Sequence, residues 1–173
     1  MNQTQVVEPP VAARGGSRLS VRRAEDADTQ SLSKMLTEVP DFSLYMRFQG
    51  AVGRPPQPEL VQRMVCPDGA AWVAERDREV VGHAMWAWVK GAAVPTAELA
   101  VIIAEAEQRR GLGVRMVGEA ARHALAAGAA QLLVLVSAMN DRVLRMVRAN
   151  WPTATAERDG ALINFTIRAA DFG

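Results

Sequence analysis

An apolar stretch near the centre of the chain has the composition of a buried strand. Leu99–Ile103 is rich in β-branched residues and has no alternation of polar positions, which is typical of a strand covered on both faces. A polar segment follows, and a helix is predicted over Val114–Ala127 with Gly128 as its C-terminal cap. A second apolar run, Gln131–Val136, predicts another buried strand. Because a helix connects them, we expect the two strands to be parallel, with a right-handed crossover.

Shorter segments with periodic apolar positions predict the helices and strands of the N-terminal part of the chain. They indicate a strand over Leu19–Arg22, a helix start capped by Asp26 or Asp28, a buried helical stripe of Leu32, Met35 and Leu36, a loop-like or short-helical segment over 41–58, and a helix over Glu59–Val65. Val39-Pro40 ends the first helix, because the residue before a proline avoids the helical conformation.

Two β-hairpins and one more helix complete the prediction. The first hairpin pairs Ala70–Glu75 with Glu79–Val89. The second pairs Trp151–Glu157 with Ala161–Arg168 around an Asp-Gly turn at residues 158–160. A helix over Arg142–Ala149 separates this hairpin from the second buried strand.

The junction between the central strand and its helix predicts an anion site. Unpaired backbone N–H groups and the helix dipole both favour a phosphate at a helix start. Gly111 and Gly113 remove side chains that would block its approach. A Walker loop needs a lysine that is missing after Lys90, and a dinucleotide loop needs a glycine where Met116 stands. A Gln-x-x-Gly-x-Gly loop beginning at Gln108 remains, and the alternative is a glycine-softened helix start that binds nothing.

Composition narrows the class of protein. A chain of 173 residues predicts one domain, with residues 1–17 as a flexible tail and 18–173 as the folded part. A net charge of +1 gives no reason to expect nucleic-acid binding. The single cysteine, Cys66, excludes an intrachain disulfide and a cysteine-based metal site, and the two histidines are too far apart to suggest a metal. Since neither a signal peptide nor a membrane span is evident, we expect a cytoplasmic protein without membrane contact.

The loop and the strand before it resemble those of a known superfamily. Gln108-x-x-Gly111-x-Gly113 after a strand is similar to the coenzyme A signature of GNAT N-acetyltransferases. Ala97-Glu98-Leu99-Ala100 resembles the strand of bacterial protein-lysine acetyltransferase domains of the Pat type, whose glutamate is the general base. The resemblance implies an α/β (α+β) fold with a mostly antiparallel sheet of about six to seven strands, two splayed parallel strands and about four flanking helices.

The resemblance also implies a binding site for acetyl-CoA without a metal. Its predicted cofactor-binding residues are Val101, Ile102, Ile103, Gln108, Arg109, Arg110, Gly111, Leu112, Gly113, Val114 and Asn140. The loop residues would hold the pyrophosphate, and the strand backbone would pair with the pantetheine amides. Asn140 stands where the superfamily binds the pantetheine arm, and it is equally well placed as a plain helix N-cap.

Glu98 is the predicted catalytic residue. A glutamate inside an apolar strand needs an explanation, because burying an unpaired carboxylate is costly. One explanation is a surface position at the strand end. The other is partial burial at the mouth of a cleft, where the carboxylate can accept a proton from the attacking amine. The tyrosine that protonates the leaving thiolate in many superfamily members is absent, since Val147 stands seven residues past Asn140. Ser137, Tyr45 or water remain as sources of that proton.

The resulting functional prediction is acetyl transfer to a primary amine, first of all a protein lysine. Two alternatives stay open: a small amine such as an antibiotic or polyamine as the acceptor, and a non-catalytic sensor of acyl-CoA. A homodimer is an expectation by analogy alone. Trp86 and Trp88 are predicted core residues with pocket lining as the alternative, and His83 on the first hairpin is a further candidate for a residue that faces the cleft.

Overall fold

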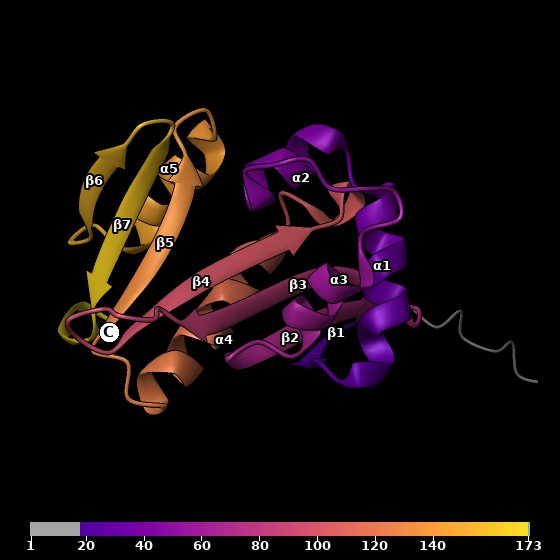
Figure 1. Ribbon diagram of the computed structural model, residues 1–173, viewed down its shortest axis with the longest axis horizontal. Helices are drawn as coiled ribbons and strands as arrows, with labels where there is room; N and C mark the ends of the chain where they lie inside the picture. Colours follow the sequence, from indigo (N-terminus) through magenta and orange to yellow (C-terminus); the bar gives the residue numbers. More distant parts are fainter. Residues whose placement is uncertain (1–17, 173) are drawn as a thin grey trace, which may run out of the picture.

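Seven strands form one mixed sheet in the computed structural model, which describes residues 18–172 of the chain (Figure 1). The strand order is β1-β2-β3-β4-β5-β7-β6. The strands are β1 (Leu19–Arg23), β2 (Gly69–Arg76), β3 (Glu79–Trp88), β4 (Thr96–Ile103), β5 (Gln131–Ser137), β6 (Thr155–Asp159) and β7 (Leu162–Arg168). Every neighbouring pair is antiparallel except β4 and β5, which are parallel as predicted. The predicted tail over residues 1–17 lies outside the described residues.

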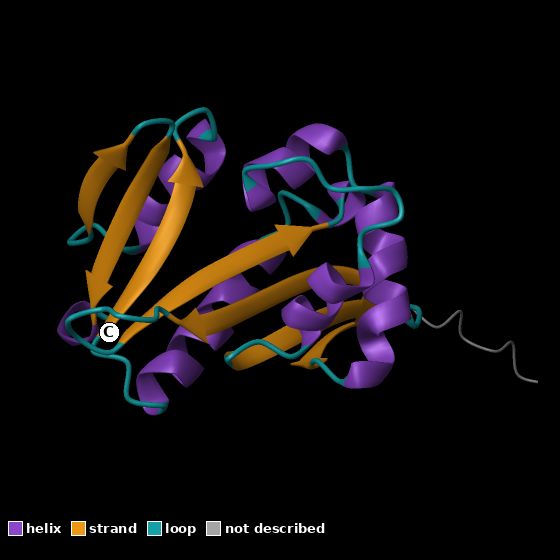
Figure 2. Cartoon of the chain, in the orientation of Figure 1, coloured by secondary structure: helices purple, strands orange, loops and turns teal. Residues whose placement is uncertain are grey.

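Five α-helices in residues 18–172 cover the two faces of the sheet (Figure 2). They are α1 (Thr29–Glu38), α2 (Asp41–Phe48), α3 (Pro58–Val65), α4 (Leu112–Ala126) and α5 (Asp141–Asn150), with short 3₁₀ turns η1 (Asp26–Asp28), η2 (Glu105–Glu107) and η3 (Ala169–Asp171). Helices α1, α2 and α3 share one hydrophobic core with β2, β3 and β4, and α4 and α5 share a second core with the other side of the sheet. The predicted fold class is confirmed, and α2 is the short-helical form of the segment expected over 41–58.

The alternation of side chains along β4 divides the strand between these two cores. Leu99 and Ile103 pack with the helix α4, whereas Ile102 packs against the core beneath α1 and α3. Side chains two residues apart share a face, so Glu98 and Ala100 lie on the same side of the sheet as Ile102. Packing on both faces thus holds the backbone of β4 in place, and with it the positions of Glu98 and Ala100.

Strands β4 and β5 are paired only along their first halves. Their register runs from Thr96 opposite Gln131 to Leu99 opposite Val134 and then stops. Beyond that point β4 continues to Ile103 beside β3, and β5 continues to Ser137 beside β7. Figure 1 shows the two strands diverging, with α2 beside the end of β4. The splayed parallel pair that we expected is therefore present.

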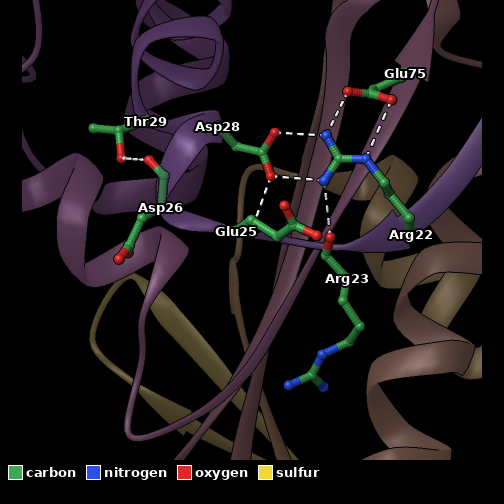
Figure 3. Close-up of polar contacts among 7 residues, drawn as sticks. All are labelled: Arg22, Arg23, Glu25, Asp26, Asp28, Thr29 and Glu75. Carbon is green, nitrogen blue, oxygen red and sulfur yellow. Dashed lines mark hydrogen bonds and ion pairs between the residues drawn. The ribbon is translucent and has the colours of Figure 1, made fainter.

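Asp28 is the N-cap residue of α1, one of the two predicted positions, but its side chain does not cap the helix. The Asp28 carboxylate makes no capping bond to α1 and instead accepts the backbone N–H of Glu25 at 2.8 Å. It also pairs with Arg22 at 2.6 Å, and Arg22 pairs with Glu75 on β2, also at 2.6 Å (Figure 3). The Arg22 guanidinium lowers the pKa of Asp28 through these hydrogen bonds. The sequence pattern identifies the acidic helix start, but not that Arg22, six residues earlier, binds the Asp28 carboxylate.

Two further details differ from the sequence predictions. The turn of the C-terminal hairpin consists of Gly160 and Ala161, because Asp159 pairs directly with Leu162, and Gly160 takes the positive φ of 58°. The strand expected from Trp151 begins only at Thr155, since the Trp151 ring is buried and stacks on Phe172. Strand β5 is buried on the α5 side, whereas Leu135 on its other face is exposed, so the expected burial on both faces is wrong there.

Candidate active site

A cavity of about 1020 Å³ opens where β4 and β5 part. Residues of α2 line one wall, and the beginnings of α4 and α5 line the opposite end. Between them run the second half of β4, the loop that follows it and the end of β5. The cavity thus occupies the gap in the sheet, and it joins the predicted anion loop to the predicted base.

The glycine loop leaves open space at its end of the cavity. Gly111 has a φ of +77°, and a Cβ atom built there would meet nothing within 4 Å. Helix α4 begins at the next residue, so the loop presents the unpaired N–H groups of a helix start to the cavity. A fifteen-residue helix also adds its dipole. An anionic group is the ligand that this geometry favours.

Gln108 fixes the loop to the elements on either side. Its Nε2 donates to the carbonyl of Ile103 at 3.0 Å and to Oε1 of Glu105 at 2.9 Å. Its Oε1 accepts a bond of 2.6 Å from the Arg142 guanidinium on α5. The same Glu105 oxygen accepts the hydroxyl of Ser43 on α2 at 2.7 Å. One chain of hydrogen bonds therefore links the α2 wall, the loop and α5.

The two loop arginines point in different directions. Arg109 lines the cavity and has a left-handed backbone with a φ of 64°. Arg110 is not among the lining residues and lies 3.6 Å from Glu107 instead. All other predicted cofactor-binding residues, from the β4 backbone to Asn140, line the cavity. Arg142 and Arg145 of α5, which the sequence analysis did not select, add positive charge at the same end.

Glu98 lines the cavity on the face of β4 that α2 overlooks. Its side chain is exposed, so the expected partial burial is wrong. The residue opposite it on β3 is Ala87, which is too small to cover a glutamate. Glu98 thus has the exposure of the surface alternative and the cavity position of the base prediction, and its catalytic role stays a prediction.

Arg47 is a further residue of this cavity that the sequence analysis missed. It lies in the last turn of α2 and lines the cavity near Glu98. Burial lowers the pKa of its guanidinium to about 10, and the charge of Glu98 acts in the opposite direction. The guanidinium stays charged at neutral pH. Arg47 is the only cation in the otherwise apolar and uncharged end of α2, among Tyr45, Met46 and Phe48, and that contrast is the signal that was available.

Asn140 is the N-cap of α5, which is one of the two roles that the sequence predicted for it. Its Oδ1 accepts the backbone N–H of Val143 at 3.2 Å, which caps α5. It also lines the cavity, so its part in holding a ligand stays a prediction.

Several other candidates lie away from the cavity. Trp86 is 2% exposed and donates its indole N–H to His123, so its core interpretation holds. His83 is fully buried, and its Nε2 donates to the carbonyl of Met64. Burial lowers the pKa of His83 to about 4, so it is neutral. Cys66 donates its thiol to Asp26, whose carboxylate raises the pKa of that thiol.

Neither hydroxyl named as a proton source lines the cavity. Ser137 is buried and its oxygen accepts the backbone N–H of Met139, and Tyr45 is exposed on α2. Within residues 18–172 no three His, Cys, Asp or Glu side chains are grouped closely enough to hold a metal ion. No helix in that range is long and apolar enough to cross a membrane.

Comparisons with solved structures return the same fold. The GNAT domain of Streptomyces lividans PAT is 20% identical and has a TM-score of 0.77, with 91% of this chain and 94% of that chain covered. The yncA protein of Salmonella typhimurium, solved with its cofactor acetyl-CoA, is 15% identical with a TM-score of 0.67, over 88% and 94% of the two chains. A GNAT family acetyltransferase of Brucella melitensis in complex with acetyl-CoA is 18% identical with a TM-score of 0.60, over 89% and 90%.

Sequence comparison identifies the family. A search of the curated proteins gives no match. The sequence model of the acetyltransferase (GNAT) family matches residues 40–150, a range that contains α2, β4, the glycine loop and α5. Since this match covers more than half of the chain, the protein belongs to the acetyltransferase (GNAT) family.

Proposed function

We propose that this protein is an N-acetyltransferase that transfers an acetyl group from acetyl-CoA to a primary amine, in the first place a protein lysine, with Glu98 as the general base. One observation carries the proposal. Glu98 and the glycine loop line the same cavity, which lies at the fork between β4 and β5. The helix start would then bind acetyl-CoA, and the Glu98 carboxylate would contact the amine in the same cavity.

The residues present fit acetyl-CoA as the co-substrate. Backbone N–H groups of residues 111–114, aided by the charge of Arg109, would hold the pyrophosphate. The side of β4 that faces the gap beyond Leu99 has no strand partner in β5, so Val101 and Ile103 are available to the amides of the pantetheine arm. The thioester supplies an activated acetyl group, and two structures similar to this one were solved with acetyl-CoA.

Glu98 prepares the acceptor for attack. A lysine with a pKa near 10.4 is almost wholly protonated at neutral pH and cannot act as a nucleophile. The Glu98 carboxylate takes a proton from this ammonium, directly or through one water. The amine nitrogen then bonds to the acetyl carbon and the carbon–sulfur bond breaks. The nitrogen loses its second proton as the amide forms, and a proton passes through water to the leaving thiolate, so that coenzyme A leaves as the thiol. Holding both substrates in one cavity supplies a further part of the rate.

The surroundings of the cavity support a protein as the acceptor. Phe42 on α2 and Met139 before α5 both line the cavity, and they are 61% and 70% exposed. These two exposed side chains, one on each side of the opening, give a protein acceptor apolar surface to contact. The Pat-like strand around Glu98 favours the same class of acceptor.

Glu98→Gln tests the proposal directly. Replacing the base while keeping its shape is expected to lower the rate of acetyl transfer to a lysine peptide by about a hundredfold or more, the usual contribution of a general base. Acetyl-CoA binding, measured by calorimetry, should not change. Glu157→Gln is the matched control, because Glu157 is an exposed strand glutamate outside the cavity. Unchanged transfer by Glu98→Gln would leave a sensor of acyl-CoA or a different base as the better interpretation.

A further inference from the structure

Arg47 is a charged side chain in the cavity without a polar partner. It makes no hydrogen bond or ion pair with any residue of the described range 18–172, and its Nε is buried there without an acceptor. Its guanidinium carbon lies 4.8 Å from the centre of the Phe48 ring, which holds the group flat against α2. The side chain is thus placed by packing alone, with its donors unused.

An arrangement of this kind is costly unless an anion completes it. The Arg47 side chain is half-buried, and its enclosed Nε–H has no acceptor, which is unfavourable because a buried donor loses its hydrogen bonds to water. The other arginines enclosed by this fold are paired: Arg22 binds Asp28 and Glu75, and Arg76 binds Glu107. A planar guanidinium with free donors is well suited to a carboxylate, which it can bind through two parallel hydrogen bonds.

The acidic groups that face the cavity do not supply this partner. Glu98 on β4 affects Arg47 by its charge but lies beyond ion-pair distance. Glu105 of η2 accepts from Ser43 and Gln108. Asp141 opens α5 at the far wall. Since no acidic group within residues 18–172 pairs with Arg47, an anion that completes it would come from a molecule that enters the cavity.

We propose that Arg47 binds a carboxylate of the acceptor, so that the preferred acceptor is an amine that carries a carboxylate nearby. Glu98 and Arg47 then act as a matched pair of charges. The carboxylate of Glu98 faces the ammonium that will be acetylated, and the guanidinium of Arg47 faces the anionic group of the same molecule. For a protein acceptor this group is the side chain of an acidic residue next to the lysine. The inference rests on the proposed function and specifies its substrate class.

The position of α2 makes the recognition precise. Ser43 ties this helix to the loop through Glu105, and Arg54 ties its beginning to Asp41 at 2.6 Å and to the carbonyl of Val39 at 2.7 Å. Arg47 is therefore held at a fixed place relative to both the glycine loop and β4. A carboxylate bound there would set the depth at which the amine reaches Glu98.

The test uses acceptors that differ only in the carboxylate. One pair consists of peptides with a single lysine next to glutamate or glutamine, and a second pair consists of Nα-acetyl-lysine and its amide. The wild type is expected to prefer the acidic member of a pair by about tenfold to a hundredfold in kcat/KM, the range for a charge-assisted hydrogen bond. Arg47→Gln should remove the preference, and Arg47→Lys should restore part of it. The peptide pair and the lysine pair distinguish a protein acceptor from a free amino acid.

Arg63→Gln is the matched control, since Arg63 is an exposed arginine in the last turn of another eight-residue helix. Affinity is also measured by calorimetry with coenzyme A present, which does not depend on the reaction. Failure of transfer to every amine would count against the proposed function, while the affinities still decide the role of Arg47. Three results would overturn the inference. The wild type could bind both members of each pair equally, it could fail to bind the acidic members, or Arg47→Gln could lower the affinity for both members by the same factor. The comparison within the wild type decides even if Arg47→Gln fails to fold.

Discussion

Two glycines with nearly the same backbone conformation allow a clean test of the anion loop. Gly111 and Gly91 have φ values of +77° and +75°, and a Cβ atom at either position would meet nothing within 4 Å. Gly111 lines the cavity, whereas Gly91 lies in the exposed turn between β3 and β4. Glutamate at either position imposes the same backbone strain. Only at position 111 does its carboxylate enter the place proposed for the pyrophosphate.

The two effects differ enough in size to be separated. A side chain in the left-handed conformation costs about 1–2 kcal/mol. For a domain of this length that cost lowers the melting temperature of both variants by about 2–8 °C. Acetyl-CoA at a hundred times its Kd adds about 2.7 kcal/mol of stability to the wild type. Repulsion between the new carboxylate and the pyrophosphate exceeds about 2.7 kcal/mol at close range, and weakens binding about a hundredfold. At that ligand concentration the added stability then falls to about 0.4 kcal/mol.

Thermal melts with and without acetyl-CoA measure both quantities on each variant. The wild type and Gly91→Glu are expected to melt about 5–11 °C higher with the ligand, and Gly111→Glu is expected to rise by no more than about 2 °C. Repeating the series with coenzyme A, propionyl-CoA and succinyl-CoA would rank the acyl groups without knowledge of the acceptor.

The reasoning fails under either of two results. If Gly111→Glu keeps the shift of the wild type, the ligand does not rest on the start of α4. If the wild type itself does not respond, the loop is a glycine-softened helix start and the cavity has another occupant. A loss of the shift in Gly91→Glu would show that strain, not charge, removes binding.

Two further changes test groups around the site. His83 is neutral in the fold, where its pKa is about 4 against an ordinary value of 6.5. The unfolded chain therefore binds more protons between these values, and stability that is complete above pH 6.5 falls by up to about 3 kcal/mol as the pH drops to 4. His83→Gln, which keeps a donor for Met64, should flatten this part of the profile in urea unfolding series, and an unchanged profile would contradict the neutral histidine. Asn140→Ala should cost about 1 kcal/mol through loss of the α5 cap, and Asn140→Asp should retain it in the same assay; equal stability of both would count against the cap.

The sequence predicted the parts of the fold that depend on local pattern and strong periodicity. Continuous apolar runs gave β4 and β5, and the connecting helix fixed their parallel direction. Glycine spacing placed the start of α4 within two residues. The spacing of the glycines predicts the backbone conformation of the loop, and this conformation positions the loop residues. All of them except Arg110 line the cavity.

What could not be predicted depends on contacts between distant segments. Arg22 and Asp28 are six residues apart, but Glu75 completes their network from β2. Arg47 lies about fifty residues before Glu98 in the sequence, and only the fold brings the two charges near each other. The exposure of Glu98 likewise follows from the small residue opposite it, Ala87. Hydrophobic pattern identifies which face of a strand is covered, but not which polar groups meet over it.

The site lies where the sheet loses its pairing, and this gives the cavity its chemistry. Past Leu99 the edge of β4 that faces β5 has no ladder partner, and an unpaired backbone edge readily accepts an extended ligand. Only a strand that is anchored elsewhere can keep such an edge open. Leu99 and Ile103 anchor β4 against α4, and Ile102 anchors it from the other face. The same alternation that buries these residues places Glu98 and Ala100 on the side of β4 where α2 lies, so core packing itself sets the position of the proposed base relative to Arg47.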